Sequence, residues 1–130
     1  IKSPIFTGGG RVFGPQPRDY YFKLNRKVKR LARKSALTYK AKDKKILVVE
    51  DFVMEEPRTK EYLAFLDNLK INGGKSLVVV NEFDKNIYLS SRNLAGTKVV
   101  ACSELSTYDI MNCVSLVFME SSIDKIQKIL

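Results

Sequence analysis

The chain has 130 residues and a hydrophobic content of 45%, the size and composition of one globular domain with a buried core. It contains no histidine, which excludes a histidine general base, Ser-His-Asp catalysis and histidine metal ligands. Its longest apolar runs fall well short of the roughly 20 residues that span a bilayer, and no secretion signal is recognisable. We therefore expect a protein that does not span a membrane, and no membrane is the main partner expected for it.

Positive charge is concentrated in the first third of the sequence. Residues 1–45 contain 14 Lys/Arg and two acids, a net charge of +12. Residues 46–130 contain 9 Lys/Arg and 12 acids, a net charge of −3. This asymmetry indicates a polyanion partner, with nucleic acid as the first expectation and an anionic membrane surface as the second.

The first 18 residues are expected to form an extended arm. They carry four glycines and three prolines and show no apolar periodicity. Apolar residues such as Ile5 and Phe6 favour an arm that orders on a partner over a disordered tail. Gly8-Gly9-Gly10 lacks the spacing of a nucleotide-binding loop, so we expect a flexible or close-approach element there.

Aromatic and basic residues are interleaved from Phe6 to Lys23. Phe13, Tyr20, Tyr21 and Phe22 lie among Arg11, Arg18 and Lys23. The mixture suits stacking on unpaired bases combined with phosphate contact. It equally suits docking of the arm onto the body of the protein, and the sequence leaves both interpretations open.

One long basic helix is predicted from the N-cap residue Asn25 to about Lys42. Its apolar residues fall on one stripe, so we expect a buried face made of Val28, Leu31, Ala32, Ser35, Ala36 and Tyr39. Lysines and arginines occupy the other faces, and Asp43 is the only acid near enough to pair with them. Such unbalanced charge favours a phosphate-contacting helix over a merely solvated one.

Beyond Lys45, short apolar runs alternate with helical patterns. We expect strands at 46–49, 77–80, 98–102 and 116–119, and helices at 59–69, 86–93 and 107–112. A last helix, capped by Ser121 or Ser122, is expected to reach Leu130. The runs at 46–49 and 77–80 consist of Ile and Val apart from one Leu in each, which predicts strands buried on both faces. Asn72-Gly73-Gly74 is expected to stop the helix before it. The alternation predicts a single α/β domain over residues 19–130, with a mainly parallel four-stranded sheet and right-handed crossovers.

Acidic residues follow three of the expected strands, and they carry the alternative function. They are Glu50, Asp51, Glu82, Asp84 and Glu104. Carboxylates at the carboxyl ends of parallel strands can hold Mg²⁺ for phosphoryl transfer, which would make a metal-dependent nuclease with a basic substrate arm. Acids in loops are also common before helices, where the helix dipole favours them. Because the spacing is irregular, we expect no metal and no cofactor.

Two smaller features are the Arg92-Asn93 pair and the two cysteines. Arg92-Asn93 follows a Ser90-Ser91 pair and either touches an RNA backbone or simply closes a helix. Cys102 and Cys113 are expected to be reduced core residues rather than a disulfide.

The order of these segments resembles a known family, the bacterial type of large-subunit ribosomal protein L four. The resemblance begins with KSPIFTGGGRVFGPQPRDYYFKLNRKVKRLARKSALTYKAK and continues through ILVVEDF, EPRTKEYLAFLDNL, NIYLSSRNL and STYDIMNCVSLVFMESSIDKI. It runs over essentially the whole chain. The family also has an N-terminal strand region and a loop with a GTGRAR-type segment before the KSP run; neither is found here, so Ile1 is expected to fall inside that loop.

The resemblance implies a non-enzymatic structural constituent of the large ribosomal subunit with a Rossmann-like body. The implied partners are large-subunit rRNA, neighbouring ribosomal proteins and, as in some family members, the protein's own messenger leader. The implied place is the cytoplasmic ribosome near the nascent-chain exit tunnel, with a role in subunit assembly. Combined with the charge pattern, the resemblance predicts RNA contact for these residues: Lys2, Arg11, Phe13, Arg18, Tyr20, Lys23, Arg26, Lys27, Lys29, Arg30, Arg33, Lys34, Lys40, Arg92 and Asn93.

Overall fold

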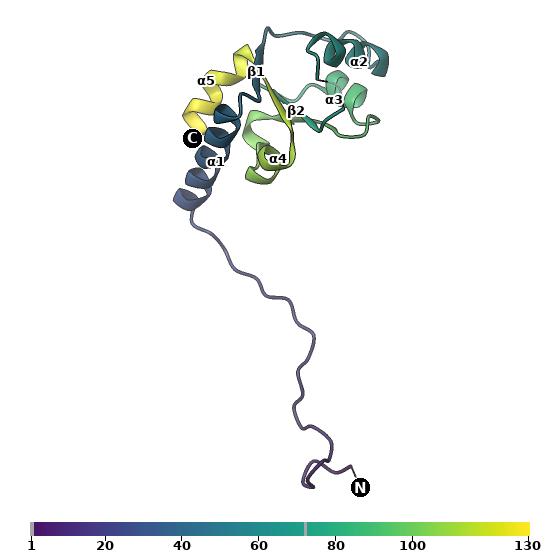
Figure 1. The fold of residues 1–130 in the computed structure, drawn as a ribbon, viewed down its shortest axis with the longest axis vertical. Coiled ribbons are helices and arrows are strands. Elements are labelled where there is room, and N and C mark those ends of the chain that lie inside the picture. Colours follow the sequence, from purple (N-terminus) through teal and green to yellow (C-terminus); the bar gives the residue numbers. More distant parts are fainter. Residues whose placement is uncertain (1, 72) are drawn as a thin grey trace.

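The computed structural model describes residues 2–71 and 73–130 (Figure 1). Its elements are α1 (Arg26–Lys42), β1 (Ile46–Val49), α2 (Thr59–Asn68), β2 (Ser76–Val80), α3 (Lys85–Ser91), β3 (Thr97–Ala101), the 3-10 turn η1 (Cys102–Glu104), α4 (Thr107–Asn112), β4 (Ser115–Met119) and α5 (Glu120–Ile129). The expected helices and strands are all present, and their ends differ from the predicted ones by at most three residues. Asn72 of the predicted helix stop lies outside the described residues, as does Ile1.

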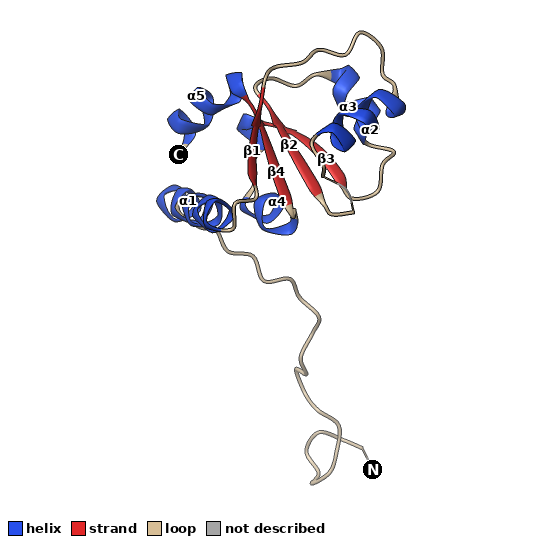
Figure 2. Cartoon of the chain, turned by 45° about the horizontal axis from the view of Figure 1, so that its top comes forward, coloured by secondary structure: helices blue, strands red, loops and turns tan. Residues whose placement is uncertain are grey.

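The four strands form one parallel sheet in the order β1-β4-β2-β3. Helices α1, α4 and α5 cover one face, and α2 and α3 cover the other (Figure 2). Each face has its own hydrophobic core, with Ile110 and Ile126 in the first and Tyr62 and Ile87 in the second. The predicted α/β class with a parallel four-stranded sheet is therefore confirmed.

The prediction of complete burial holds for one of the two β-branched runs. All five residues of β2 are buried, as expected for a central strand with neighbours on both sides. For β1 the prediction is wrong, because Leu47 and Val48 are exposed. The reason is position: β1 is an edge strand that pairs only with β4 among the described strands.

Helix α1 buries a different face from the predicted one. Its buried or half-buried residues are Arg33, Ala36, Leu37 and Lys40. Of the predicted stripe only Ala36 is buried, whereas Leu31 is 68% and Tyr39 59% exposed. The second half of α1 packs against α4 and the sheet, and the first half extends beyond the sheet (Figure 1). The position of the body thus decides which face is covered, and the local apolar count does not.

Two helix starts also differ from expectation. Asn25 is the N-cap of α1 by backbone conformation, but its side chain makes no capping hydrogen bond. Helix α5 begins at Glu120, directly after β4, rather than at a capping serine. The hydroxyl of the buried Ser122 instead donates to the Met119 carbonyl.

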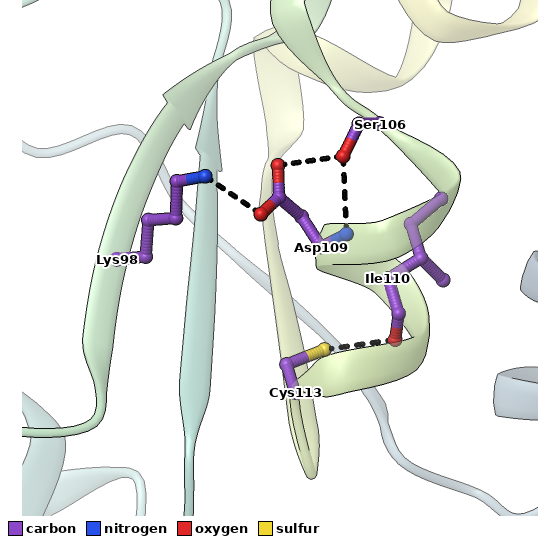
Figure 3. Close-up of polar contacts among 5 residues, drawn as sticks. All are labelled: Lys98, Ser106, Asp109, Ile110 and Cys113. Atoms are coloured by element: carbon purple, nitrogen blue, oxygen red, sulfur yellow. Dashed lines mark hydrogen bonds and ion pairs between the residues drawn. The ribbon is translucent and has the colours of Figure 1, made fainter. Parts of the chain in front are cut away.

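A polar cluster fixes α4 to the sheet (Figure 3). Asp109 accepts from Lys98 Nζ of β3 at 2.6 Å and from Ser106 Oγ at 2.8 Å. Ser106 caps α4, because its Oγ accepts from the Asp109 backbone N–H at 3.1 Å. Cys113 Sγ donates to the Ile110 carbonyl at 3.2 Å. Cys113 and Cys102 are free, buried thiols, as predicted, and burial raises the pKa of both.

Residues 2–25 contain no helix or strand and extend away from the sheet (Figure 1). Residues 2–10 fold back on themselves, since the Gly10 N–H donates to the Lys2 carbonyl at 2.8 Å. A Cβ on Gly9 would lie 1.9 Å from the Ser3 carbonyl oxygen, so this turn requires glycine. The division of the chain into an arm and a domain remains a prediction. No helix in the described part is both long and apolar enough to cross a membrane.

Candidate nucleic-acid interface

Helix α1 carries the densest set of uncompensated cations in the described structure. Arg26, Lys27, Lys29, Arg30 and Lys34 are exposed, and Arg33 is half-buried. Within residues 2–71 and 73–130 no ion pair includes any of these six side chains. The first turn of α1 holds no acid, although the helix dipole favours negative charge there. These cations therefore carry an electrostatic cost within the protein, and a polyanion would relieve it.

Lys40, predicted to contact RNA, does not belong to this surface. It is 8% exposed, and its Nζ donates to the carbonyl of Cys113 at 2.5 Å. The hydrogen bond ties α1 to the end of α4. Lys40 is therefore a structural residue, and the prediction that it contacts RNA does not fit its buried position.

The facing ends of α1 and α5 line a depression of about 410 Å³, which we call the basic depression. Arg26, Lys29, Arg30 and Arg33 form one wall, and Lys128 with the half-buried Ile129 forms the other. Lys128 was absent from the residues predicted for RNA contact. No local signal identifies it, because it lies about 100 residues from α1 in the chain and only the fold brings the two together.

The predicted contact residues before α1 are all exposed and lie apart from the body (Figure 1). They are Lys2, Arg11, Phe13, Arg18, Tyr20 and Lys23. The guanidinium of Arg18 lies over the Tyr20 ring, 4.5 Å from its centroid. Phe13 is fully exposed and has a φ of 51°, an unusual backbone conformation for a large side chain. In this structure the aromatic residues are available to a partner and do not dock onto the body.

Arg92 and Asn93 are exposed but stand apart from α1. Arg92 caps the C-terminus of α3, which covers the opposite face of the sheet from α1. The structure therefore does not combine this pair with the basic helix into one surface.

Three of the five acids that follow the strands have structural contacts of their own. Asp84 caps α3 by accepting from the Asn86 N–H at 2.8 Å. Asp51 accepts from Ser121 Oγ at 3.0 Å, and Glu82 pairs with Lys125 at 3.4 Å. Among the described residues, no three acids or cysteines come together in a group that could hold a metal ion. The geometry thus gives the nuclease interpretation no assembled site in that part of the chain.

Comparison with known proteins identifies the family of the chain. The model of the ribosomal protein L4/L1 family matches residues 1–129. The large ribosomal subunit protein uL4 of Christiangramia forsetii is 58% identical over 98% of this chain, and that of Bacteroides fragilis is 55% identical over all of it. These alignments cover 61% and 62% of the two relatives, so the chain spans about three-fifths of their length. The chain belongs to the ribosomal protein L4/L1 family.

Proposed function

We propose that the chain is part of a structural, non-enzymatic constituent of the large ribosomal subunit that binds rRNA through residues 2–25 and α1. It acts on the cytoplasmic ribosome, supports subunit assembly and lies near the nascent-chain exit tunnel. The observation that carries the proposal is the set of unpaired cations on α1. Family membership selects rRNA from among the polyanions that such a surface could bind.

The physical basis is phosphate neutralisation. Each Lys or Arg that contacts a phosphate releases condensed counterions from the RNA, which favours binding at low salt. The exposed aromatic residues between Phe13 and Phe22 add surfaces on which unpaired bases can stack. The same contacts would serve on a messenger leader, so that RNA is the second ligand to test.

The exposed apolar stripe of α1 suits the other proposed class of partner, a neighbouring ribosomal protein. Val28, Leu31 and Tyr39 are 49%, 68% and 59% exposed, and they share one side of the helix. Burying such side chains against a protein surface is favourable by roughly 25 cal/mol per Å² of apolar area removed from water.

Co-sedimentation tests the proposal. Tagged protein in a cell lysate should sediment with the large subunit and remain there after a high-salt wash, because many phosphate contacts and buried apolar surface act together. Protein found only in the soluble fraction before the wash would refute the ribosomal assignment. A nuclease would show that distribution and would also cleave added RNA.

A further inference from the structure

The basic depression occupies the face of α1 that turns toward the body. Arg26, Lys29, Arg30 and Arg33 follow one another at helical spacing, and the same face continues through the buried Ala36 and Lys40. A helix face that turns toward the body of a protein normally carries apolar side chains. In the first two turns of α1 this face carries only cations, and Lys128 stands on the opposite wall.

The charge of the depression has no internal counterpart. No carboxylate is among its lining residues, and none of its five cations forms an ion pair within the described chain. Like charges that converge on one hollow repel one another. The apolar side of Ile129 reduces the local solvent screening of that repulsion.

The chemistry of the lining identifies the ligand class. Three of the five cations are arginines, whose planar guanidinium groups match two phosphate oxygens at once. The two lysines add point charges on flexible stems. A hollow of about 410 Å³ with cations on both walls suits a chain of linked phosphates that passes between them.

We propose that the basic depression binds consecutive phosphates of a single RNA strand, held between α1 and the last turn of α5, and that Lys128 is one of the binding residues. The inference rests on the proposed function, but adds to it a second RNA-contacting helix and makes the site a two-walled unit. Without α5, the cations of α1 would form only an open surface.

A charge-matched set of variants tests the site. We would measure binding of the full chain to a large-subunit rRNA transcript by filter retention over a salt series, using Lys128→Gln, Arg30→Gln and the double variant. Lys60→Gln is the control, because Lys60 is an exposed lysine on α2, across the sheet, and has no ion pair among the described residues. Lys128→Arg restores the charge.

If Lys128 contacts a phosphate, Lys128→Gln should reduce the log–log salt slope by about 0.7–0.9, and Lys128→Arg should restore it. Lys60→Gln should leave the slope unchanged. If Lys128 and Arg30 hold the same strand, the loss of affinity in the double variant should differ from the product of the two single losses.

The outcomes separate this inference from the proposed function. If Lys128→Gln matches Lys60→Gln while the unmodified chain binds the transcript, the basic depression is refuted and the proposed function stands. The same conclusion follows if Lys128→Arg fails to restore the slope, because charge is then not what Lys128 supplies. An unmodified chain that does not bind the transcript refutes both.

Discussion

Replacement of Tyr62 by phenylalanine should stabilise the protein. Tyr62 lies in α2, is 0% exposed and packs beside Phe65, with ring centroids 6.0 Å apart. Its hydroxyl has no hydrogen-bond partner among the described residues. A buried polar group without a partner loses its hydration and gains nothing in return.

The size of the effect follows from two opposing terms. Desolvation of an unpaired hydroxyl costs about 1–3 kcal/mol, and Tyr62→Phe removes that cost. The missing oxygen leaves a void of about 15 Å³, which at about 24 cal/mol per Å³ costs about 0.4 kcal/mol. The net expectation is a gain of about 1 kcal/mol in the free energy of unfolding.

Urea denaturation followed by circular dichroism measures this gain as a higher midpoint with an unchanged m-value. Tyr108→Phe is the matched control, because Tyr108 is 73% exposed and the same change there should stay within about 0.5 kcal/mol. A Tyr62→Phe protein that is less stable than the unmodified chain would show that the hydroxyl has a partner in solution, and the reasoning would fail.

The pH dependence of stability provides a second, independent test of this prediction. Burial raises the pKa of Tyr62 in the folded state above its usual value of about 10. The unfolded chain therefore loses this proton at a lower pH than the folded chain does. The free energy of unfolding of the unmodified protein is consequently unaffected by this group below about pH 10 and declines above it. Tyr62→Phe lacks this group, and its advantage over the unmodified chain should grow above about pH 10. The buried thiols titrate in both proteins, so their contribution cancels.

Three further predictions concern the RNA surface and the body. Four cations of α1 can be replaced together by glutamine: Arg26, Lys29, Arg30 and Arg33. The log–log salt slope of rRNA binding should then fall by about three units, with unchanged circular dichroism. An unchanged slope would place the RNA contact elsewhere. Ser106→Ala should lower the free energy of unfolding by about 1 kcal/mol, measured by urea denaturation, since it removes the cap of α4. Ser103→Ala is the control, because Ser103 is an exposed serine whose side chain makes no hydrogen bond among the described residues, and equal effects would argue against the cap. Amides of residues 2–25 should exchange in the isolated chain at nearly unfolded rates while those of β2 are protected, and strong protection of the former would show that they pack on the body.

The elements of the body could be predicted from the sequence because their signals are local. Short runs of four or five residues that are rich in Val, Ile and Leu, each followed by a turn and a helical pattern, predict strands in a parallel sheet. Strand order was not predictable, because it depends on which edges meet in space. That missing information is the reason that β1 was expected to be buried on both faces, although an edge strand leaves Leu47 and Val48 exposed.

In the candidate site too, the features with a local signal could be predicted and those that depend on long-range contacts could not. The concentration of charge on α1 is visible in the sequence, because net charge and spacing are properties of neighbouring residues. The role of Lys40 is not visible, since the carbonyl that accepts from its ammonium lies 73 residues away at Cys113. Lys128 escapes sequence reasoning for the same reason. A long-range contact can remove a lysine from the surface or add one to it without any change in the local pattern.

The first half of α1 is weakly stabilised by the protein itself. A helix segment without tertiary packing is marginal in water, and most helical stability in proteins comes from a buried face. The first turns of α1 lack such a face, and the cations of its very first turn oppose the helix dipole by about 0.3–1 kcal/mol each. A phosphate bound at the same place reverses the sign of that term, because the dipole and the side chains then attract the same ligand. The residues that weaken α1 in the free chain are therefore those that would stabilise it most in the complex with RNA.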